Sequence, residues 1–451
     1  MRSIALLAVV FLLTGCGSSP GTSGSRQPPP TYPFPAANTL QFVHEFGTNT
    51  NPGATDIPGD AITGLQADGS GNLLLAGSTH GNLPGYSNEG IINKGALYKL
   101  DANGNQIWAK ELSSGVGDEL DGVVVTASGI FVLGDTWGAY PGASNPSGID
   151  EPFIAEYDDS GNLLWLKQYS YPSSSQGLFL EVLRADSSGN LIFAGEIDDS
   201  VGGQDLFVQK IDASGSALWE NTFGNGASDL MNGMSTDANG DIYAVGATSG
   251  TFPGNQTSTI SEPFVLKLDG ATGATVWLQQ FGDSTTFPIF YPSDVQAIPG
   301  GKLDVAGGNV VTPSGLPVTQ IEVMQMDAAT GSPLWHFQFG GDIGDIPGPL
   351  IVDPNGNIYI AGMTQSAFAS GVTMHVQDVF LAKIDPDGNP LWAQQFGTGL
   401  DGPPLVEGLF APFYLSLGNQ GVYIGGMTHG QFPGFSNPNQ YTDLFLAKFW
   451  Q

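Results

Sequence analysis

Cysteine and positive charge are both scarce in this sequence. Of its 451 residues one is cysteine, Cys16, and 12 are lysine or arginine against 43 aspartate or glutamate, which gives a net charge of −31. A single cysteine excludes an internal disulfide, so the core must stabilise the fold, and a chain of this length can bury a large core. The acidic balance excludes a nucleic-acid ligand, because such a surface repels phosphate. It favours cations or basic partners.

Charged residues and long apolar runs are also few. Asp, Glu, Lys and Arg make up 12% of the chain, about half of the usual share, so uncharged polar residues and glycine must cover much of the surface. After residue 13 no apolar segment approaches the roughly 20 residues that a membrane-spanning helix needs. Glycine and proline are abundant, with 65 and 31 residues. They recur at a fixed period beside apolar strands, which indicates a folded chain.

The first residues have the pattern of an export signal. Arg2 is followed by an apolar run and then by Leu13-Thr14-Gly15-Cys16, which predicts a secretory signal peptide over residues 1–15. The Leu-Thr-Gly-Cys segment resembles the bacterial lipobox, which implies cleavage before Cys16 and acylation of its thiol. Residues 16–39 are rich in Gly, Ser and Pro, and we expect them to form a tether.

Three short patterns cycle through residues 40–451, and each occurs seven times. The first is an aromatic strand that ends near Phe-Gly, at residues 40–47 and then around Trp108, Trp165, Trp219, Trp277, Trp335 and Trp392. The second is an apolar strand that ends in glycine, as in Gly356–Gly362, and the third resembles Phe380–Asp385. A fourth, less uniform strand precedes each glycine-ending strand.

Four strands per repeat, with tight-turn sequences such as Asp101–Gly104 between them, predict one blade of antiparallel sheet. The chain ends on the third pattern, at residues 443–449, and a solitary strand of the aromatic type follows the tether at residues 40–47. Pairing of these two segments would complete the last blade and remove exposed sheet edges. The predicted fold is therefore an all-β, seven-bladed β-propeller of four-stranded antiparallel blades over residues 40–451, with 3+1 closure by the N-terminal strand.

Two resemblances support this fold. The segments Gly356–Gly362, Phe380–Asp385 and Leu391–Gly397 resemble the bacterial SBBP repeat, named for the seven-bladed β-propeller, which implies a secreted or surface location without a settled activity. Met326–Trp335, with a weaker copy at Leu268–Trp277, is similar to the Trp-docking motif of quinoprotein propellers. That motif also occurs in the propeller lipoprotein of the outer-membrane barrel-assembly machinery. It packs tryptophan between blades, and these families usually have eight blades.

The longer connections of the predicted blades emerge on one face, which is the candidate binding face. A loop of the form Thr-x-Gly-x-x-Pro-Gly recurs there, at residues 79–85, 136–142, 248–254 and 428–434, and its last part is expected to be a packed turn. The second position is occupied by His80, Trp137 and His429 in three blades that ring closure would make consecutive. We predict an aromatic patch of these three residues for a sugar or a peptide. The alternative is three unconnected side chains that face solvent.

No catalytic residue and no metal ligand is predicted. The sequence has no Gly-x-Ser-x-Gly elbow, and the only thiol, that of Cys16, is taken by the lipid. Turns such as Asp237–Asp241 and Asp353–Asn357 resemble a calcium loop, but threonine stands where that loop needs its twelfth-position glutamate. Hairpin turns explain them better. No cofactor is expected, and only weak calcium binding by some of these turns is left open.

Taken together, these features favour a monomeric, non-catalytic binding module that is exported and lipid-anchored to the bacterial cell envelope, with an envelope protein, a glycan or a cation as ligand. Gly17, in place of the aspartate that marks inner-membrane retention, implies the outer membrane. One alternative is a carbohydrate lyase or hydrolase at the mouth of the central channel, which a cluster of carboxylates with shifted pKa there would favour. Another is a barrel-assembly accessory lipoprotein, which eight blades would favour.

Overall fold

The computed structural model describes the greater part of the region predicted to be a propeller, within a unit that spans Tyr32–Gln451. The described residues are 40–46, 60–81, 83, 86, 93–145, 148–169, 177–198, 203–253, 255, 262–281, 290–311, 318–341, 344–365, 378–397, 409–419, 421–428, 432 and 443–450. None of them belongs to a helix long and apolar enough to span a bilayer. Cys16, the predicted signal peptide and the predicted tether lie outside these residues.

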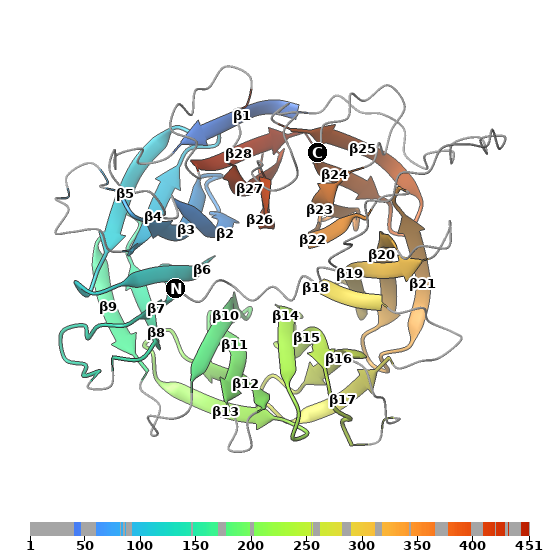
Figure 1. The fold of residues 1–451 in the computed structure, drawn as a ribbon, viewed down its shortest axis with the longest axis horizontal. Helices are drawn as coiled ribbons and strands as arrows, with labels where there is room; N and C mark the ends of the chain where they lie inside the picture. Colours follow the sequence, from blue (N-terminus) through green and yellow to red (C-terminus); the bar gives the residue numbers. More distant parts are fainter. Residues whose placement is uncertain are drawn as a thin grey trace, which may run out of the picture. The chain divides into compact units, whose positions relative to one another are not determined.

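Twenty-eight strands in the described residues form seven four-stranded antiparallel sheets, which stand as blades around a central axis (Figure 1). Blades 1 to 6 each take four consecutive strands, from β2–β5 to β22–β25, and blade 7 consists of β26, β27, β28 and β1. The all-β, seven-bladed architecture that the repeats predict is confirmed.

Each blade runs from an inner strand to an outer strand. The inner strands are β2 (Ala61–Ala67), β6 (Asp118–Val125), β10 (Leu178–Ala185), β14 (Asp229–Thr236), β18 (Phe290–Ile298), β22 (Ile346–Val352) and β26 (Leu409–Gly418). The second strands are β3 (Leu73–Thr79), β7 (Ile130–Thr136), β11 (Leu191–Asp198), β15 (Ile242–Thr248), β19 (Lys302–Val311), β23 (Ile358–Thr364) and β27 (Gly421–Thr428). The third strands are β4 (Lys94–Leu100), β8 (Glu151–Tyr157), β12 (Gln204–Ile211), β16 (Glu262–Leu268), β20 (Val318–Asp327), β24 (Asp378–Ile384) and β28 (Asp443–Phe449). The outer strands are β5 (Gln106–Leu112), β9 (Leu163–Gln168), β13 (Ala217–Phe223), β17 (Thr275–Gln280), β21 (Pro333–Phe339), β25 (Pro390–Phe396) and β1 (Leu40–Phe46).

The ring is closed by the first strand, as predicted. β1 pairs antiparallel with β28, and Val43 lies opposite Ala447 in this pairing. Val43 packs against the apolar cluster that holds Ala447 and Phe449. Blade 7 is thereby a complete sheet, and its third strand has no unpaired edge, which would otherwise be open to association with another chain.

The glycine that ends the second sequence pattern lies near the end of each second strand, opposite an irregularity in the inner strand. In blade 1 the pairing of β2 with β3 shifts between Ile62 and Gly64, so Thr63 is an extra residue, and Gly77 lies opposite Ile62. A Cβ atom on Gly77 would come 1.9 Å from the carbonyl oxygen of Ala61. Only glycine fits this position, which explains why the second pattern ends in glycine in every repeat.

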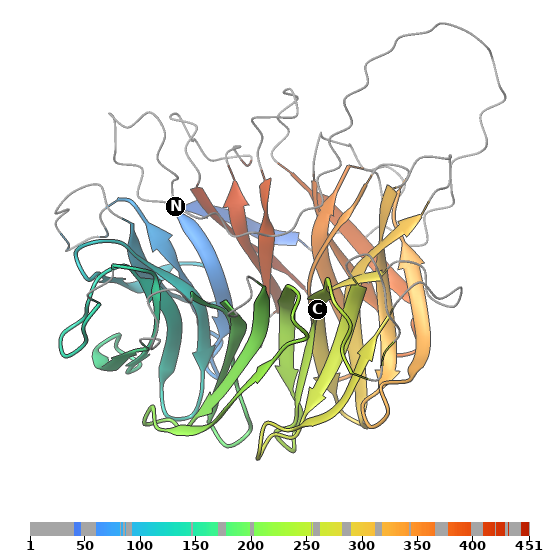
Figure 2. The same ribbon diagram turned by 60° about the horizontal axis from the view of Figure 1, so that its bottom comes forward.

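The tight turns between strands are built by aspartate side chains. The amides of Ser70 and Asn72 each donate to Oδ1 of Asp68 at 2.8 Å, and Gly71 follows with a φ of 87°, which glycine adopts without strain. The same arrangement recurs at Asp101 in the same blade and, in other blades, at Asp158, Asp186, Asp353 and Asp385. These short turns lie along the lower edge of the ring in Figure 2, on the face opposite to the longer connections.

Adjacent blades are joined by the outer-strand tryptophan of one blade and a turn glycine of the next. Trp219 of blade 3 lies over Gly273 of blade 4, and a Cβ atom on Gly273 would come 2.6 Å from Cε3 of the indole. Four further contacts of this kind follow the ring, which are Trp108 on Gly161, Trp165 on Gly215, Trp277 on Gly331 and Trp335 on Gly388. At the closing blade, Phe42 and His44 of β1 take the position of tryptophan over Gly104 of blade 1. The Trp-docking resemblance therefore describes real packing between blades.

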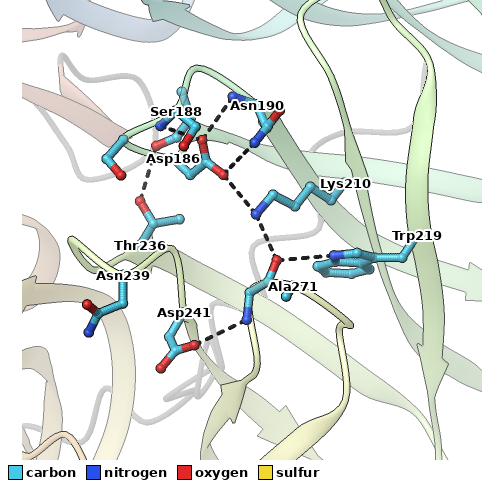
Figure 3. A network of polar contacts seen from close by, with 12 residues as sticks. Asp186, Ser188, Asn190, Lys210, Trp219, Thr236, Asn239, Asp241 and Ala271 are labelled. Atoms are coloured by element: carbon cyan, nitrogen blue, oxygen red, sulfur yellow. Dashed lines mark hydrogen bonds and ion pairs between the residues drawn. The ribbon is translucent and has the colours of Figure 1, made fainter.

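A buried lysine reinforces the same junction. Nζ of Lys210 pairs with Oδ2 of Asp186 in its own blade at 2.8 Å and donates to the carbonyl oxygen of Gly270 in blade 4, also at 2.8 Å. Nε1 of Trp219 donates to that carbonyl at 3.3 Å (Figure 3). Burial alone would raise the pKa of Asp186, but the hydrogen bonds from Lys210 and Asn190 hold it below its usual value. This junction is a paired, buried network between two blades.

Candidate functional site

The recurring Thr-x-Gly loop is held by its own threonine. Oγ1 of Thr136 accepts a hydrogen bond from the amide of Gly138 at 2.9 Å, and Thr79 and Thr248 accept from Gly81 and Gly250 at 3.0 Å. These threonines are completely buried at the ends of their strands. The hydroxyl fixes the backbone on both sides of the variable position, so that its side chain emerges from a rigid turn.

The outer strand supports the same loop with a polar pair. In blade 2, Nε2 of Gln168 donates to the carbonyl of Gly138 at 3.0 Å and to Oε2 of Glu151 at 2.6 Å. In blade 4, Gln280 makes the same two contacts, with Gly250 and Glu262. In blade 1 the donor and the acid have exchanged strands, because Lys94 stands on the third strand in place of the glutamate and forms an ion pair of 3.4 Å with Glu111 on the outer strand. The pairing is preserved within the chain although the residue types differ.

A large side chain anchors the end of each loop. Leu83, Tyr140, Phe252 and Phe432 are all buried, with exposed fractions of 2% to 6%. Tyr140 also donates its hydroxyl to Oδ1 of Asp118 at 2.9 Å. The prediction that this part of the loop is a packed turn is confirmed for these described residues.

Trp137 is an exposed side chain on this platform. Its exposed fraction is 38%, and its ring lies against Gly117, where a Cβ atom would come 3.0 Å from Cε3. His80 occupies the same position in the neighbouring blade and is half-buried. His429 lies outside the described residues. The three-residue aromatic patch therefore stays a prediction.

Carboxylates that the sequence did not single out gather on the strands beneath Trp137. Glu119 on β6 lies directly opposite Asp135 on β7, and Asp121 is the bulge residue of β6. Asp150 directly precedes β8 and forms a hydrogen bond with Trp137. Nδ2 of Asn93 donates to Oε2 of Glu119 at 3.3 Å. We call Glu119, Asp121, Asp135 and Asp150 the acidic cluster.

Burial and mutual repulsion raise the pKa values of carboxyl groups in this cluster. Burial raises the pKa of Asp121 and of Asp135 well above the usual range, and neighbouring carboxylates raise it further. Burial also raises the pKa of Asp150, although the hydrogen bond with Trp137 works against the shift. On blade 3, burial raises the pKa of Glu181, the bulge residue of β10, to about 7. Perturbed pKa values of this kind gather at functional sites and mark candidates for them.

The internal repeats carried a signal for these residues. The bulge position of the inner strand is Thr63, Asp121, Glu181, Asn232 and Ser293 in blades 1 to 5. An acid appears only in the adjacent blades 2 and 3 among these five. Alignment of the repeats by their glycine-ending strands would have exposed this difference.

The calcium-like turns act as hairpin turns. Oδ1 of Asp237 accepts from the amides of Asn239 and Asp241 at 2.9 and 3.0 Å, and Oδ1 of Asp353 accepts from Asn355 and Asn357 in the same way. Nowhere in the described part of the chain do three or more His, Cys, Asp or Glu side chains gather in a set that could hold a metal ion.

The fold and the loop-built face define the class of this chain, a seven-bladed β-propeller with one elaborated face. A family model described as a beta-propeller repeat, SBBP, matches residues 334–369, which extend from β21 beyond β23. This match confirms the resemblance to the SBBP repeat in that segment.

Other comparisons concern distant proteins. No curated protein matches the chain. Among solved structures it is similar to the WD40 domain of Neurospora crassa Pan2, with 12% identity, 87% of this chain and 92% of that chain covered, and a TM-score of 0.45. It is also similar to a protein of unknown function from Dyadobacter fermentans, with 10% identity, coverage of 92% and 100%, and a TM-score of 0.46. A third is the β-propeller domain of the Trilobed protease from Pyrococcus furiosus, with 8% identity, coverage of 87% and 94%, and a TM-score of 0.46.

Asp229 of blade 4 makes the stability of this face dependent on pH. It accepts a hydrogen bond from Asn225 at 3.0 Å, and burial raises its pKa from 3.8 to about 6. The folded state therefore holds the proton more tightly than the unfolded state, so the stability that this group contributes falls as the pH rises from about 4 to 6 and stays low above that.

We predict that Asp229→Asn removes this dependence. The difference in the free energy of urea unfolding, variant minus native protein, should increase by roughly 3 kcal/mol from pH 4 to pH 8, as two units of pKa imply. Exposed Asp387→Asn serves as the control and should show a shift near zero. Equal pH dependence of the Asp229→Asn variant and the native protein would contradict the role of Asp229.

Proposed function

We propose that this chain is a binding module of the bacterial cell envelope, in which the face of longer connections engages a protein or a glycan. The observation that supports this most directly is the Thr-x-Gly platform. Its threonine, its polar support and its buried anchor are kept in three described blades, while the residue that the platform presents changes from His80 to Trp137 to Ser249. A rigid support with a variable exposed residue is the arrangement that binding surfaces use.

The proposal includes export and a lipid anchor at Cys16 in the outer membrane, and a monomeric propeller. Its support is the sequence pattern at residues 1–16. Membranes can be dissolved in a detergent that then separates into a detergent-rich phase, which takes up lipid-anchored proteins, and an aqueous phase. Replacement of Cys16 by serine should move the protein from the detergent-rich phase to the aqueous phase. The native chain should in addition incorporate labelled palmitate. A Cys16→Ser variant that stays in the detergent-rich phase would contradict the anchor.

A second candidate function is a carbohydrate lyase or hydrolase. It is favoured by the acidic cluster and Glu181, because carboxyl groups with a raised pKa on inner strands of adjacent blades could serve as general acids near neutral pH. The barrel-assembly alternative gains no such support, since the ring has seven blades and not eight.

We predict that the exposed indole of Trp137 contributes to binding by the native face. Trp137→Ala should lower retention on a glycan array, or photo-crosslinking to envelope components, by about fivefold or more. Trp450→Ala is the matched control, because Trp450 is also exposed, at 51%, but follows β28 at the end of the ring that carries the tight turns. Absence of any glycan or envelope partner for the native protein would contradict the binding module. Mass spectrometry of the same glycans would reveal cleavage products, whose loss in Glu181→Gln would support the enzyme.

A further inference from the structure

The seven blades provide an internal comparison for the acidic cluster. Near the long-loop edge of every blade, three residues lie side by side on the inner, second and third strands. In five blades these sets contain no carboxylate and no basic side chain. The five sets are Ala61/Ser78/Gly95, Leu230/Ala247/Pro263, Tyr291/Gly308/Ile321, Ile346/Met363/Val379 and Phe410/Met427/Leu444. Blade 3 has one acid, Glu196, in the set Phe179/Glu196/Leu206. Blade 2 has two, in the set Glu119/Asp135/Pro152.

The acids of blade 2 are costly for the fold. Like charges directly opposite each other in a sheet destabilise it, and burial of a carboxylate without a positive partner costs more. Among the ion pairs between described residues, none includes a member of the acidic cluster. Because five blades form the same sheet without this set of acids, the propeller fold itself does not require them.

Hydrogen-bond donors are also scarce at this place. Three acceptor atoms there are buried and have no hydrogen-bond partner, namely Oδ2 of Asp121, Oδ1 of Asp150 and Oδ1 of Asn93. The donors from outside the cluster that reach it, among the described residues, are the neutral amide of Asn93 and the indole of Trp137, and within it Asp135 forms a hydrogen bond with Asp150. The site thus has a surplus of acceptors, and a donor-rich cation would complete it.

Trp137 provides an independent indication of the ligand. Its indole is exposed and forms a hydrogen bond with Asp150 of the cluster, and its ring lies against Gly117. A ring of this kind attracts a cation over its face. Since the carboxylates are not arranged as a set of three or more metal ligands, a planar or tetrahedral organic cation with several N–H groups matches the site better than a bare metal ion.

We propose that the acidic cluster and Trp137 form a pocket for the basic side chain of a partner protein, an arginine guanidinium or a lysine ammonium group. This inference rests on the proposed binding function and names the chemistry of its ligand. The net charge of −31 would steer a basic partner toward the propeller. The cluster then selects where its cation docks, at the long-loop edge of blade 2.

Binding of synthetic peptides to the full chain in detergent tests the proposal. The probes are Gly-Ser-Arg-Gly-Arg-Ser-Gly, the same peptide with lysine, and the same peptide with citrulline, which keeps the shape of arginine but lacks its charge. Isothermal titration calorimetry at pH 7.5 should show binding of the arginine or lysine peptide and at least about tenfold weaker binding of the citrulline peptide.

Variants locate the pocket. Glu119→Gln combined with Asp135→Asn should weaken the basic peptide by at least about tenfold, and Trp137→Ala by about fivefold. Glu220→Gln combined with Asp387→Asn removes the same charge from two exposed residues far from the cluster, and it should change affinity by less than about twofold. Thermal unfolding of each variant shows that it is folded. If the variant with Glu119 and Asp135 replaced unfolds, the affinity of the Trp137→Ala variant for the basic peptide decides the test, because Trp137 is exposed and its replacement leaves the fold intact.

Three outcomes would overturn the proposal. They are equal weakening by the control pair, equal binding of the citrulline peptide, and no binding of either basic peptide at millimolar concentration. Calcium titration is run in parallel, and calcium that binds at the cluster in place of the peptides also counts against it. If Trp137→Ala abolishes capture of an envelope component while no basic peptide binds, the binding module stands and the basic-ligand pocket falls.

Discussion

The contact between an outer-strand aromatic residue and the turn glycine of the next blade is the constraint on which this fold depends. A four-stranded blade has two faces to bury, and it can do so only between two neighbours. The Trp219–Gly273 contact sets that distance, because the backbone of Gly273 leaves no room for a side chain beneath the indole. The ring closes because β1 supplies Phe42 and His44 to the same position over Gly104. One strand at the start of the propeller therefore completes both a sheet and the circle of contacts.

The two ends of the ring have different roles, and this difference explains why one face can vary. The tight turns, the outer-strand tryptophans and buried lysines such as Lys210 lie toward one end of the ring, where they fix adjacent blades. The opposite end carries the longer connections, and each Thr-x-Gly loop there is supported from within its own blade. A change of the residue at the position of Trp137 therefore leaves the packing between blades intact. Specificity can change on a scaffold whose assembly does not depend on it.

Most of the scaffold could be predicted from the sequence, whereas of the acidic cluster only Asp121 carried a signal there, at the bulge position of its repeat. Gly77 and Gly362 recur because the inner-strand bulge admits no Cβ atom, so their period gives the number of blades directly. Glu119 and Asp135 are separated in the sequence and are two among 43 acids, and only the strand register shows that they face each other. His80, Trp137 and His429 were predicted from one loop motif. That motif describes the backbone of the loop, and it carries no information on whether neighbouring side chains meet.

The central claim is that the strand Leu40–Phe46 is the outer strand of the last blade. Hydrogen exchange of the native protein, followed by mass spectrometry of its peptides, measures this directly. The account predicts that amides of β1 which bond to β28 exchange as slowly as those in the outer strands of other blades, and far more slowly than an unstructured segment. Exchange of residues 40–46 at the rate of a free chain would contradict closure of the ring, and with it the shared contact that unites the blades.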